Sequence, residues 1–548
     1  MYDINLTIYE GEKILIAGAS GSGKSTLGSC LNGLIPFSYE GEITGSLLVD
    51  GKEAKEQSLF ELSKIIGTVL QDPDGQFIGL TVGEDIAFSL ENDCIPVDEM
   101  HRYTLEAASL VGIENQLSSA PHTLSGGQKQ RVSMAGVIVD KVKLLLFDEP
   151  LASLDPATGK RAIGLIDRIQ KETNTTVIII EHRLEDVLCR EVDRIVLLSD
   201  GRIAADMPAD EFLSGALLAQ HGIREPLYLT ALKYAGVSVT PDKKPSNIDS
   251  LRLSAGDCES LRKWFRETQP ALPEEDRPVI LEVRELSFAY EAGKTVLENV
   301  SFQIREGELT AIVGTNGAGK STLAKLICGF ELPAQGSVVF EGRDLANDTI
   351  TERARHIGYV MQNPNQMISK TMIFDEVALG LQNSGMTQEE MRDRVEDTLK
   401  ICGLYPFRNW PISALSYGQK KRVTIASILA LRPKIIILDE PTAGQDFRHY
   451  TDIMVFLEAL NHQGVTVLII THDMHLMLEY APRALVFSEK RLIADVTSAG
   501  ALTNPGLTER ASLKETSLFT LANRCHIDNP TEFAQRFIDY DREKRKNG

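Results

Sequence analysis

Short runs of apolar residues alternate with longer stretches of mixed polarity along most of the chain. Three such runs, rich in Val, Ile and Leu, are Lys13–Ala17, Leu144–Phe147 and Val177–Ile180. Strands that are buried on both faces have continuous apolar runs of this kind, whereas strands with one solvated face alternate apolar and polar residues. The pattern therefore predicts an α/β fold with a mainly parallel sheet that helices cover on both faces.

The sequence also repeats itself once. The segment GEKILIAGASGSGKST over Gly11–Thr26 returns as GELTAIVGTNGAGKST over Gly307–Thr322, and later motifs return in the same order. Two copies of one domain are the simplest explanation of this self-similarity. We predict a first domain over residues 1–221, a connector over 222–278, a second domain over 279–500 and a small helical extension over 501–548.

Each copy carries a glycine-rich loop of the form G-x-x-x-x-G-K-[ST], placed between an apolar run and a helical stretch. Glycines let successive backbone N–H groups turn toward phosphate oxygens, and the helix N-terminus adds partial positive charge. We expect Lys24 and Lys320 to reach the β- and γ-phosphates of a nucleotide, and the Ser25 and Ser321 hydroxyls to bind Mg²⁺. The predicted loop residues are Gly18, Gly21, Gly23, Lys24, Ser25 and Thr26 in the first copy and Gly314, Gly317, Gly319, Lys320, Ser321 and Thr322 in the second.

A pair of acids follows an apolar strand in each copy. The pairs are Asp148-Glu149 and Asp439-Glu440, each followed by proline. Acids at the carboxyl end of a buried strand lie where parallel sheets bind their ligands, although one such pair alone also fits a solvated strand end. We expect each aspartate to hold Mg²⁺ and each glutamate to polarise a water for attack on the γ-phosphate.

Composition and charge limit the classes of partner. The 548 residues include 43% apolar and 24% charged residues, which is typical of a globular protein with a sizeable core. The chain has 57 Lys and Arg against 77 Asp and Glu, a formal charge of −20, which disfavours a nucleic-acid partner. Its apolar runs are far shorter than the ~20 residues that a membrane-spanning helix needs. We therefore expect a cytoplasmic protein that forms no pore itself.

The motif LSGGQ over Leu124–Gln128, upstream of the first acid pair, resembles the signature of ABC transporter ATPases. The second copy has LSYGQ over Leu415–Gln419, with Tyr417 where glycine is usual. The resemblance covers both copies and implies two tandem P-loop ABC nucleotide-binding domains with ATP and Mg²⁺ as ligands. Each domain then has a mainly parallel sheet core, an antiparallel subdomain and a helical subdomain.

The resemblance also assigns roles to further residues. Gln71 and Gln362 match the loop that touches Mg²⁺ and senses a membrane partner, while His182 and His472 match the switch histidine at the γ-phosphate. Tyr290 matches the aromatic residue that stacks on adenine. Its equivalent in the first copy, and the opening strand, would fall before residue 1. We expect either that the natural start lies upstream or that the first site binds adenine without this platform.

Two signature motifs imply an intramolecular pairing of the domains, because in the family each signature closes the phosphate loop of the opposite copy. Hydrolysis then removes the γ-phosphate that bridges them, and the copies part. The tyrosine in LSYGQ should weaken the first site without abolishing it, which predicts unequal ATP hydrolysis at the two sites. The residues expected to close the first site are Ser416 and Gly418, and those for the second are Ser125 and Gly127. Gln419 and Gln128 are also expected at the nucleotide.

The segments QDPDGQF and TVGEDIAF, within residues 71–88, resemble the ATPases of energy-coupling factor importers of the cobalt and thiamine-precursor type. This implies a transmembrane coupling subunit that docks on residues 74–88 and 365–379, and a separate substrate-binding membrane subunit. The protein then sits at the cytoplasmic face of the membrane. A soluble tandem ATPase acting on ribosomes is the alternative, disfavoured by the neutral connector and the acidic chain. A DNA-repair ATPase is disfavoured by the lack of a Cys-x-x-Cys pair.

Overall fold

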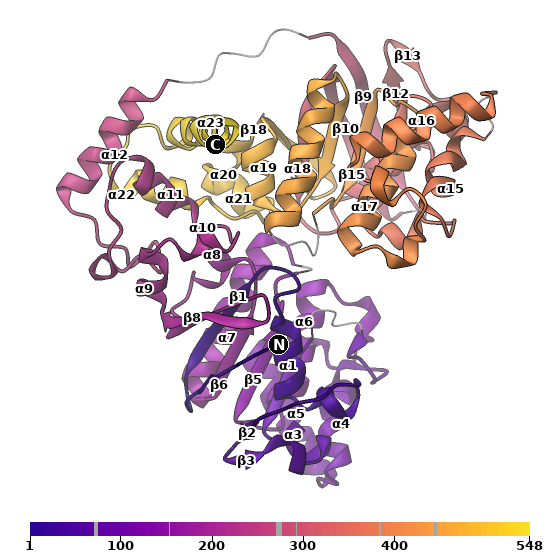
Figure 1. The fold of residues 1–548 in the computed structure, drawn as a ribbon. Coiled ribbons are helices and arrows are strands. Elements are labelled where there is room, and N and C mark those ends of the chain that lie inside the picture. Colours follow the sequence, from indigo (N-terminus) through magenta and orange to yellow (C-terminus); the bar gives the residue numbers. More distant parts are fainter. Residues whose placement is uncertain are drawn as a thin grey trace. The chain divides into compact units, whose positions relative to one another are not determined.

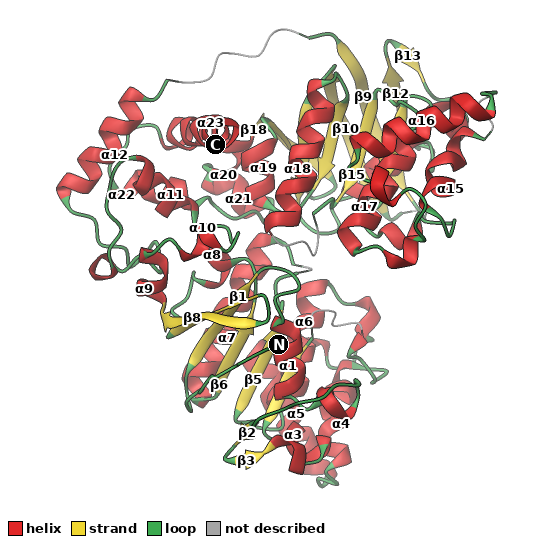
Figure 2. Cartoon of the chain, in the orientation of Figure 1, coloured by secondary structure: helices red, strands yellow, loops and turns green. Residues whose placement is uncertain are grey.

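The computed structural model describes residues 1–70, 75–152, 154–269, 277–291, 293–382, 385–442 and 447–547. The chain divides into two compact units, Met1–Leu261 and Arg262–Gly548 (Figure 1). Helices and strands alternate along both units (Figure 2), as an α/β fold requires.

The core of the first unit is a six-stranded sheet in the order β4-β5-β6-β1-β7-β8. Neighbouring strands are parallel except for β8, which pairs antiparallel with β7. Every residue of β1 and β6 is buried, which explains their continuous apolar sequence and confirms the predicted parallel sheet. The strands are β1 (Lys13–Gly18), β4 (Ile66–Val69), β5 (Leu144–Asp148), β6 (Thr176–Ile180), β7 (Arg194–Ser199) and β8 (Arg202–Pro208).

Helices α4, α5 and α6 of the first unit pack on one another and form its helical subdomain. A short hairpin of β2 (Leu48–Val49) and β3 (Lys52–Glu53) is also present. The helices are α1 (Lys24–Leu31), α2 (Leu34–Phe37), α3 (Leu59–Ser63), α4 (Val82–Asn92), α5 (Val97–Val111), α6 (Gly126–Ile138), α7 (Pro156–Thr173), α8 (Leu184–Val187), α9 (Ala209–Ser214), α10 (Leu217–Gln220) and α11 (Leu227–Tyr234). Helix α12 (Ala255–Glu267) begins in the first unit and ends in the second.

The second unit repeats the core sheet strand for strand, in the order β14-β15-β16-β11-β17-β18. The identical order confirms the duplication seen in the sequence. The strands are β11 (Leu309–Gly314), β14 (Ile357–Val360), β15 (Ile435–Asp439), β16 (Thr466–Ile470), β17 (Arg483–Ser488) and β18 (Arg491–Thr497). The helices are α13 (Lys320–Cys328), α14 (Ile350–Ala354), α15 (Ile373–Ala378), α16 (Gln388–Ile401), α17 (Tyr417–Leu429), α18 (Phe447–His462), α19 (Met474–Tyr480), α20 (Ser498–Leu502), α21 (Pro505–Arg510), α22 (Ser517–Arg524) and α23 (Pro530–Asn547).

The predicted antiparallel subdomain differs between the units. In the second unit it is a four-stranded sheet of β9 (Val279–Ala289), β10 (Thr295–Arg305), β12 (Gln335–Phe340) and β13 (Arg343–Asp344), in the order β10-β9-β12-β13. In the first unit Ile4, Leu6 and Ile8 pack on the core, as the alternating apolar residues of β10 do, but residues 4–8 are not in a strand.

The C-terminal helices pack on the second half of the connector within the second unit. The Trp264 ring of α12 meets Phe533 and Tyr540 of α23 edge to face, with centroid distances of 5.9 and 5.6 Å. Arg536 donates to the carbonyls of Phe265 and Thr268. Among all the helices described, each is too short or too polar to cross a bilayer.

Candidate nucleotide-binding sites

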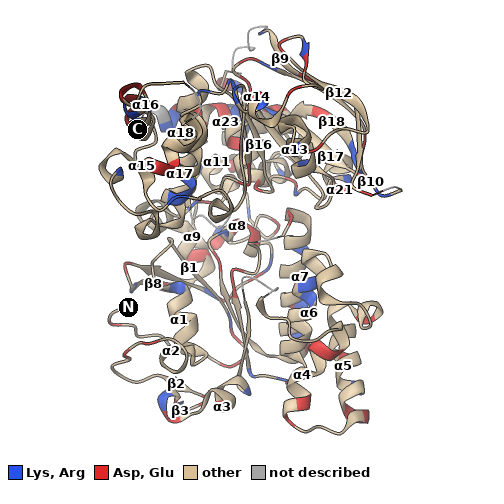
Figure 3. Cartoon of the chain, turned by 90° about the vertical axis from the view of Figure 1, so that its right-hand side faces the viewer, with Lys and Arg blue, Asp and Glu red and all other residues tan. Residues whose placement is uncertain are grey.

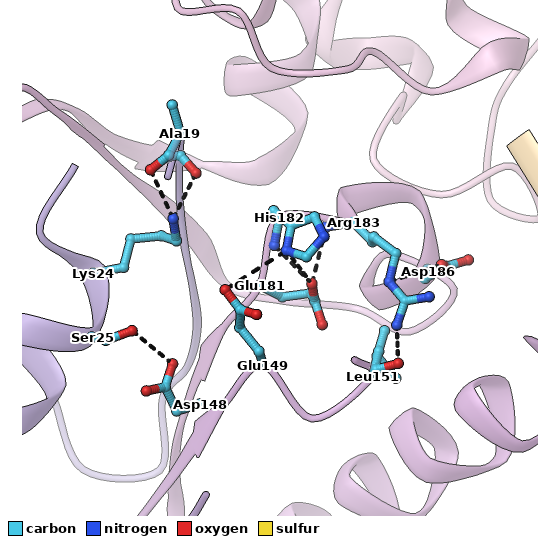
Figure 4. Close-up of polar contacts among 11 residues, drawn as sticks. Ala19, Lys24, Ser25, Asp148, Glu149, Leu151, Glu181, His182, Arg183 and Asp186 are labelled. Carbon is cyan, nitrogen blue, oxygen red and sulfur yellow. Dashed lines mark hydrogen bonds and ion pairs between the residues drawn. The ribbon is translucent and has the colours of Figure 1, made fainter. Parts of the chain in front are cut away.

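The first glycine-rich loop connects β1 to α1 and encloses the Lys24 ammonium. Gly21 and Gly23 have φ of 75° and 104°, a region that favours glycine because a Cβ would clash with the backbone. The Lys24 Nζ donates to the carbonyls of Gly18 and Ala19 at 2.9 Å each (Figure 4). The loop therefore places a cation at the N-terminus of a helix, where phosphate oxygens bind.

The second loop, between β11 and α13, has the same geometry. Lys320 Nζ donates to the carbonyls of Gly314 and Thr315 at 2.9 Å each. A Cβ at Gly314 would lie 1.8 Å from the Phe487 carbonyl oxygen, so only glycine fits there. The two loops are thus equivalent in backbone and in the position of the lysine.

A serine and an aspartate lie together beside the first loop. The Ser25 hydroxyl donates to Asp148 Oδ1 at 3.2 Å (Figure 4), and burial followed by the charge of Glu149 raises the pKa of Asp148. In the second unit the Tyr359 hydroxyl donates to Asp439 Oδ2 at 3.0 Å. Mg²⁺ at a nucleotide takes one or two protein oxygen ligands besides phosphates and waters, and the hydroxyl and carboxylate oxygens here fit that donor set.

Each predicted glutamate lies next to its predicted histidine. His182 Nδ1 is 3.8 Å from Glu149 Oε1, and His472 Nε2 is 3.3 Å from Glu440 Oε1. The structure therefore brings together, within each unit, the acid at the end of one strand and the histidine that follows the next.

The pKa values of the two glutamates are shifted in opposite directions. Although burial opposes ionisation, the contact with His182 and the charges of His182 and Lys24 lower the pKa of Glu149. Burial, reinforced by the charge of Asp439, raises the pKa of Glu440 to about 8. Burial lowers the pKa of His182, whereas the nearby carboxylates of Glu181 and Glu149 raise it. The net effect is a raised pKa. Sequence reasoning missed Glu181, although an acidic residue directly before the switch histidine is visible in the sequence.

The signature residues cap the helices that follow them. Ser125 and Gln128 form a capping box at the start of α6, and Ser416 and Gln419 form one at the start of α17. A Cβ at Gly127 would lie 2.6 Å from Thr158 Cγ2, whereas Gly418 is buried. The predicted glutamines are therefore engaged within their own helices, each in the capping box at the N-terminus of its helix.

The loop of the second copy that contains Gln362 is hydrogen-bonded to side chains of α17. The Gln362 carbonyl accepts from Lys421 Nζ at 2.8 Å and from the Tyr417 hydroxyl at 3.4 Å, and Lys421 also donates to the Met361 carbonyl at 2.7 Å. Burial lowers the pKa of Lys421 to about 8. Sequence reasoning missed Lys421, which replaces Gln130 of the first copy. The equivalent Gln71 lies outside the residues that the structure describes.

Tyr290 stands beside the second phosphate loop. Its ring packs edge to face on Phe288 with a centroid distance of 4.8 Å, its hydroxyl is 3.4 Å from Thr322 Oγ1, and 52% of the residue is exposed. An exposed ring next to the loop could stack on a base. The stacking role stays a prediction, as does the role of Thr26 in the first loop.

The duplicated sheets and phosphate loops define two tandem P-loop nucleotide-binding domains. Residues 1–152 and 297–443 match a family model described as ABC transporter, and residues 215–288 match a model described as ATP-binding cassette cobalt transporter. The chain belongs to the ABC transporter ATP-binding family and is an ATPase, which confirms the fold and activity expected from the motifs.

Relatives match over the whole chain. An ABC transporter ATP-binding protein of Clostridium perfringens is 59% identical over 99% of this chain and 95% of the relative, and one of Enterococcus faecalis is 57% identical over the same shares. Among solved structures, cbiO1 of Clostridium perfringens, titled as part of the ABC transporter complex cbiONQ, is 32% identical. It covers 45% of this chain and 98% of that chain, with a TM-score of 0.40.

Proposed function

We propose that the chain is the energising subunit of an energy-coupling factor type importer at the cytoplasmic face of a membrane. It would couple ATP hydrolysis to uptake of a vitamin, a vitamin precursor, a metal ion or a similar micronutrient. The match of residues 215–288 to a model described as ATP-binding cassette cobalt transporter carries this proposal. These residues lie between the two ABC transporter matches.

Two ATP molecules would bind where the domains pair head to tail. The Lys24 and Lys320 loops would hold the phosphates, and the signatures containing Ser416 and Ser125 would close the opposite sites. Each bound Mg²⁺ would neutralise charge on the β- and γ-phosphates. Its ligands would be Ser25, Gln71 and Asp148 at the first site and Ser321, Gln362 and Asp439 at the second.

Glu149 and Glu440 would each accept a proton from the attacking water, and His182 and His472 would contact the γ-phosphate. Since each glutamate lies beside its histidine, loss of the γ-phosphate would directly change the surroundings of the glutamate that acts as the base. These assignments rest on the family resemblance and on the contacts described above.

The membrane partner would dock on the segment before and within α4. Ile78 and Leu80 are 65% and 82% exposed, which leaves large apolar side chains in water. The Asp85 carboxylate accepts from the backbone N–H groups of Ile78 and Gly79 at 2.8 and 3.0 Å, so this loop has a fixed form before any partner binds. A fixed apolar surface suits a helix of a coupling subunit.

Charge argues against the ribosomal alternative. In the view of Figure 3, acidic and basic residues are interspersed within each unit, and the chain carries a net charge of −20. RNA-binding surfaces concentrate Lys and Arg to neutralise phosphates. We therefore favour a protein partner in the membrane.

Co-purification of the full chain from its native membranes tests the proposal. We expect integral membrane proteins to be captured with wild type and with Leu48→Asp, and to be lost with Leu80→Asp. Leu48 is a matched control because it is 60% exposed and lies in the β2 hairpin, outside the proposed docking segment. Capture of ribosomes without membrane proteins would overturn the importer proposal and favour the alternative. Uptake of labelled micronutrients into vesicles that contain the captured complex would identify the substrate.

A further inference from the structure

The two histidines next to the glutamates have different neighbours along the chain. Strand β6 is followed by Glu181-His182-Arg183, whereas β16 is followed by Thr471-His472-Asp473. Since the backbone of the two units is equivalent at this point, the difference lies in the side chains. A buried carboxylate precedes the histidine in one copy only.

Glu181 is completely buried and its carboxylate is fixed by the backbone. Its Oε1 accepts from the N–H groups of His182 and Arg183 at 2.8 and 3.2 Å. The same oxygen is 3.1 Å from His182 Nδ1 (Figure 4). Because two backbone groups hold the carboxylate, it presents a fixed negative charge to the imidazole at this distance.

The second copy holds its histidine differently. The Thr471 hydroxyl accepts from the backbone N–H of Asp473 at 3.0 Å, and Asp473 in turn caps α19. His472 approaches Glu440 through Nε2, at 3.3 Å, whereas His182 faces its two carboxylates through Nδ1. The two imidazoles therefore turn different nitrogens toward their glutamates, Nδ1 in His182 and Nε2 in His472.

We propose that Glu181 is a positioning residue of the first site, which holds His182 at its Nδ1 edge and directs Nε2 away from Glu149. This proposal deepens the ATPase function proposed above and rests on it. His182 would then offer a charged N–H to a phosphate oxygen, and the first site would differ from the second in how its histidine is held.

The charges around His182 support this assignment. Glu181 and Glu149 face the imidazole with negative charge, while Arg183 opposes them and Lys24 lies near Glu149. The Arg183 guanidinium is drawn away because it donates to the Leu151 carbonyl and lies 3.9 Å from Asp186. Burial disfavours the imidazolium, yet the two carboxylates outweigh it and leave the pKa of His182 raised.

Titration of the histidine by NMR tests the contact directly. The His182 signals of ¹⁵N-histidine-labelled full chain would be assigned by their loss in His182→Gln. We expect Glu181→Gln and Glu181→Thr to lower the His182 titration midpoint by roughly one pH unit, because an opposing charge at contact distance shifts a pKa by about that much or more. Glu181→Gln keeps the shape of the side chain, and Glu181→Thr installs the residue of the second copy.

Asp186→Asn is the matched control, because it removes a nearby carboxylate that faces Arg183 instead of the imidazole. It should leave the His182 midpoint as in wild type. An unchanged midpoint in Glu181→Gln would overturn the proposal. Thermal unfolding of each variant shows whether the fold is kept, and the isosteric glutamine provides the test if the threonine variant does not fold.

Kinetics then connect the contact to the reaction. In a Glu440→Gln background, which isolates the first site, kcat should fall at high pH, and Glu181→Gln should move that fall to lower pH by about the same amount as the NMR midpoint. A shifted midpoint with an unshifted kcat profile would refute the positioning role in catalysis. If wild type does not hydrolyse ATP, the proposed function fails, while the NMR titration still decides whether Glu181 holds His182.

Discussion

Glu149 and Glu440 share a left-handed backbone conformation, with φ of 48° and 47°. Each N–H donates at 2.9 Å to the carbonyl that ends the neighbouring strand, Ile180 or Ile470. Residues other than glycine seldom adopt this conformation, and it persists where the surroundings enforce it. The strand end therefore fixes the backbone of both glutamates in the same way, while their electrostatic surroundings differ.

Replacing the loop lysines should weaken ATP binding. Lys24→Ala and Lys320→Ala each remove an ammonium that the loop holds ready for phosphate, and we expect the affinity of the affected site to fall at least tenfold, about 1.4 kcal/mol. Equilibrium binding of a fluorescent ATP analogue measures this. Lys52→Ala, on the exposed β3 strand, is the control and should bind as wild type does. Unchanged binding in both loop variants would refute the phosphate assignment.

Removing the bases should stop the chemistry. We expect Glu149→Gln and Glu440→Gln each to lower ATP turnover, and the double variant to lower it by about a hundredfold or more, because general bases contribute factors of that size. The double variant should retain bound ATP, since hydrolysis no longer releases the γ-phosphate. Phosphate release and filter binding measure the two effects. Turnover that persists in the double variant would show that the base lies elsewhere.

The tyrosine in the second signature, Tyr417, should raise the apparent KM for ATP. Tyr417→Gly removes a ring at the first turn of α17 and restores the residue found at Gly126, so we expect the apparent KM for ATP to fall a few-fold. The cost to the helix is about 0.5–1 kcal/mol. Tyr417→Phe is the control, because it removes only the hydroxyl that contacts the Gln362 carbonyl. A higher KM in the glycine variant would contradict the assignment.

A buried ion pair should make the first unit sensitive to acid. Lys13 Nζ contacts Asp167, and Lys171 Nζ is 2.9 Å from the same carboxylate. Burial opposes ionisation, but the hydrogen bonds from these lysines lower the pKa of Asp167. A lowered pKa contributes stability that is complete above the unfolded carboxyl value near 3.9 and is lost as the pH falls through the folded value.

We therefore expect Asp167→Asn to lower the free energy of unfolding by about 3 kcal/mol at pH 7, and by progressively less as the pH approaches the folded pKa. Denaturant titrations at several pH values measure this. Lys171→Ala, which removes the exposed partner, should cost no more than about 1 kcal/mol. A loss that does not depend on pH would contradict the ionic origin.

The sequence was sufficient for those features that local motifs encode. The loop around Lys24, the strand that ends at Asp148 and the histidine after β6 all follow from short patterns whose physical role is general. Contacts between distant segments could not be predicted. The hydrogen bond of Tyr359 to Asp439, and that of Lys421 to Gln362, depend on how elements pack, and neither residue belongs to a motif.

The capping boxes show a second limit. Gln128 and Gln419 were expected at the nucleotide, and the structure places each against the backbone of its own serine. A residue type can satisfy a motif and a local hydrogen bond at once, so a sequence alone does not separate the two roles.

The bonds from Lys421 and Tyr417 to the Gln362 carbonyl have a mechanical consequence. A force that displaces this loop must either stretch those bonds or pull on the first turns of α17, to which both side chains are attached. Movement at the loop thus becomes movement of a helix, without passing through the sheet.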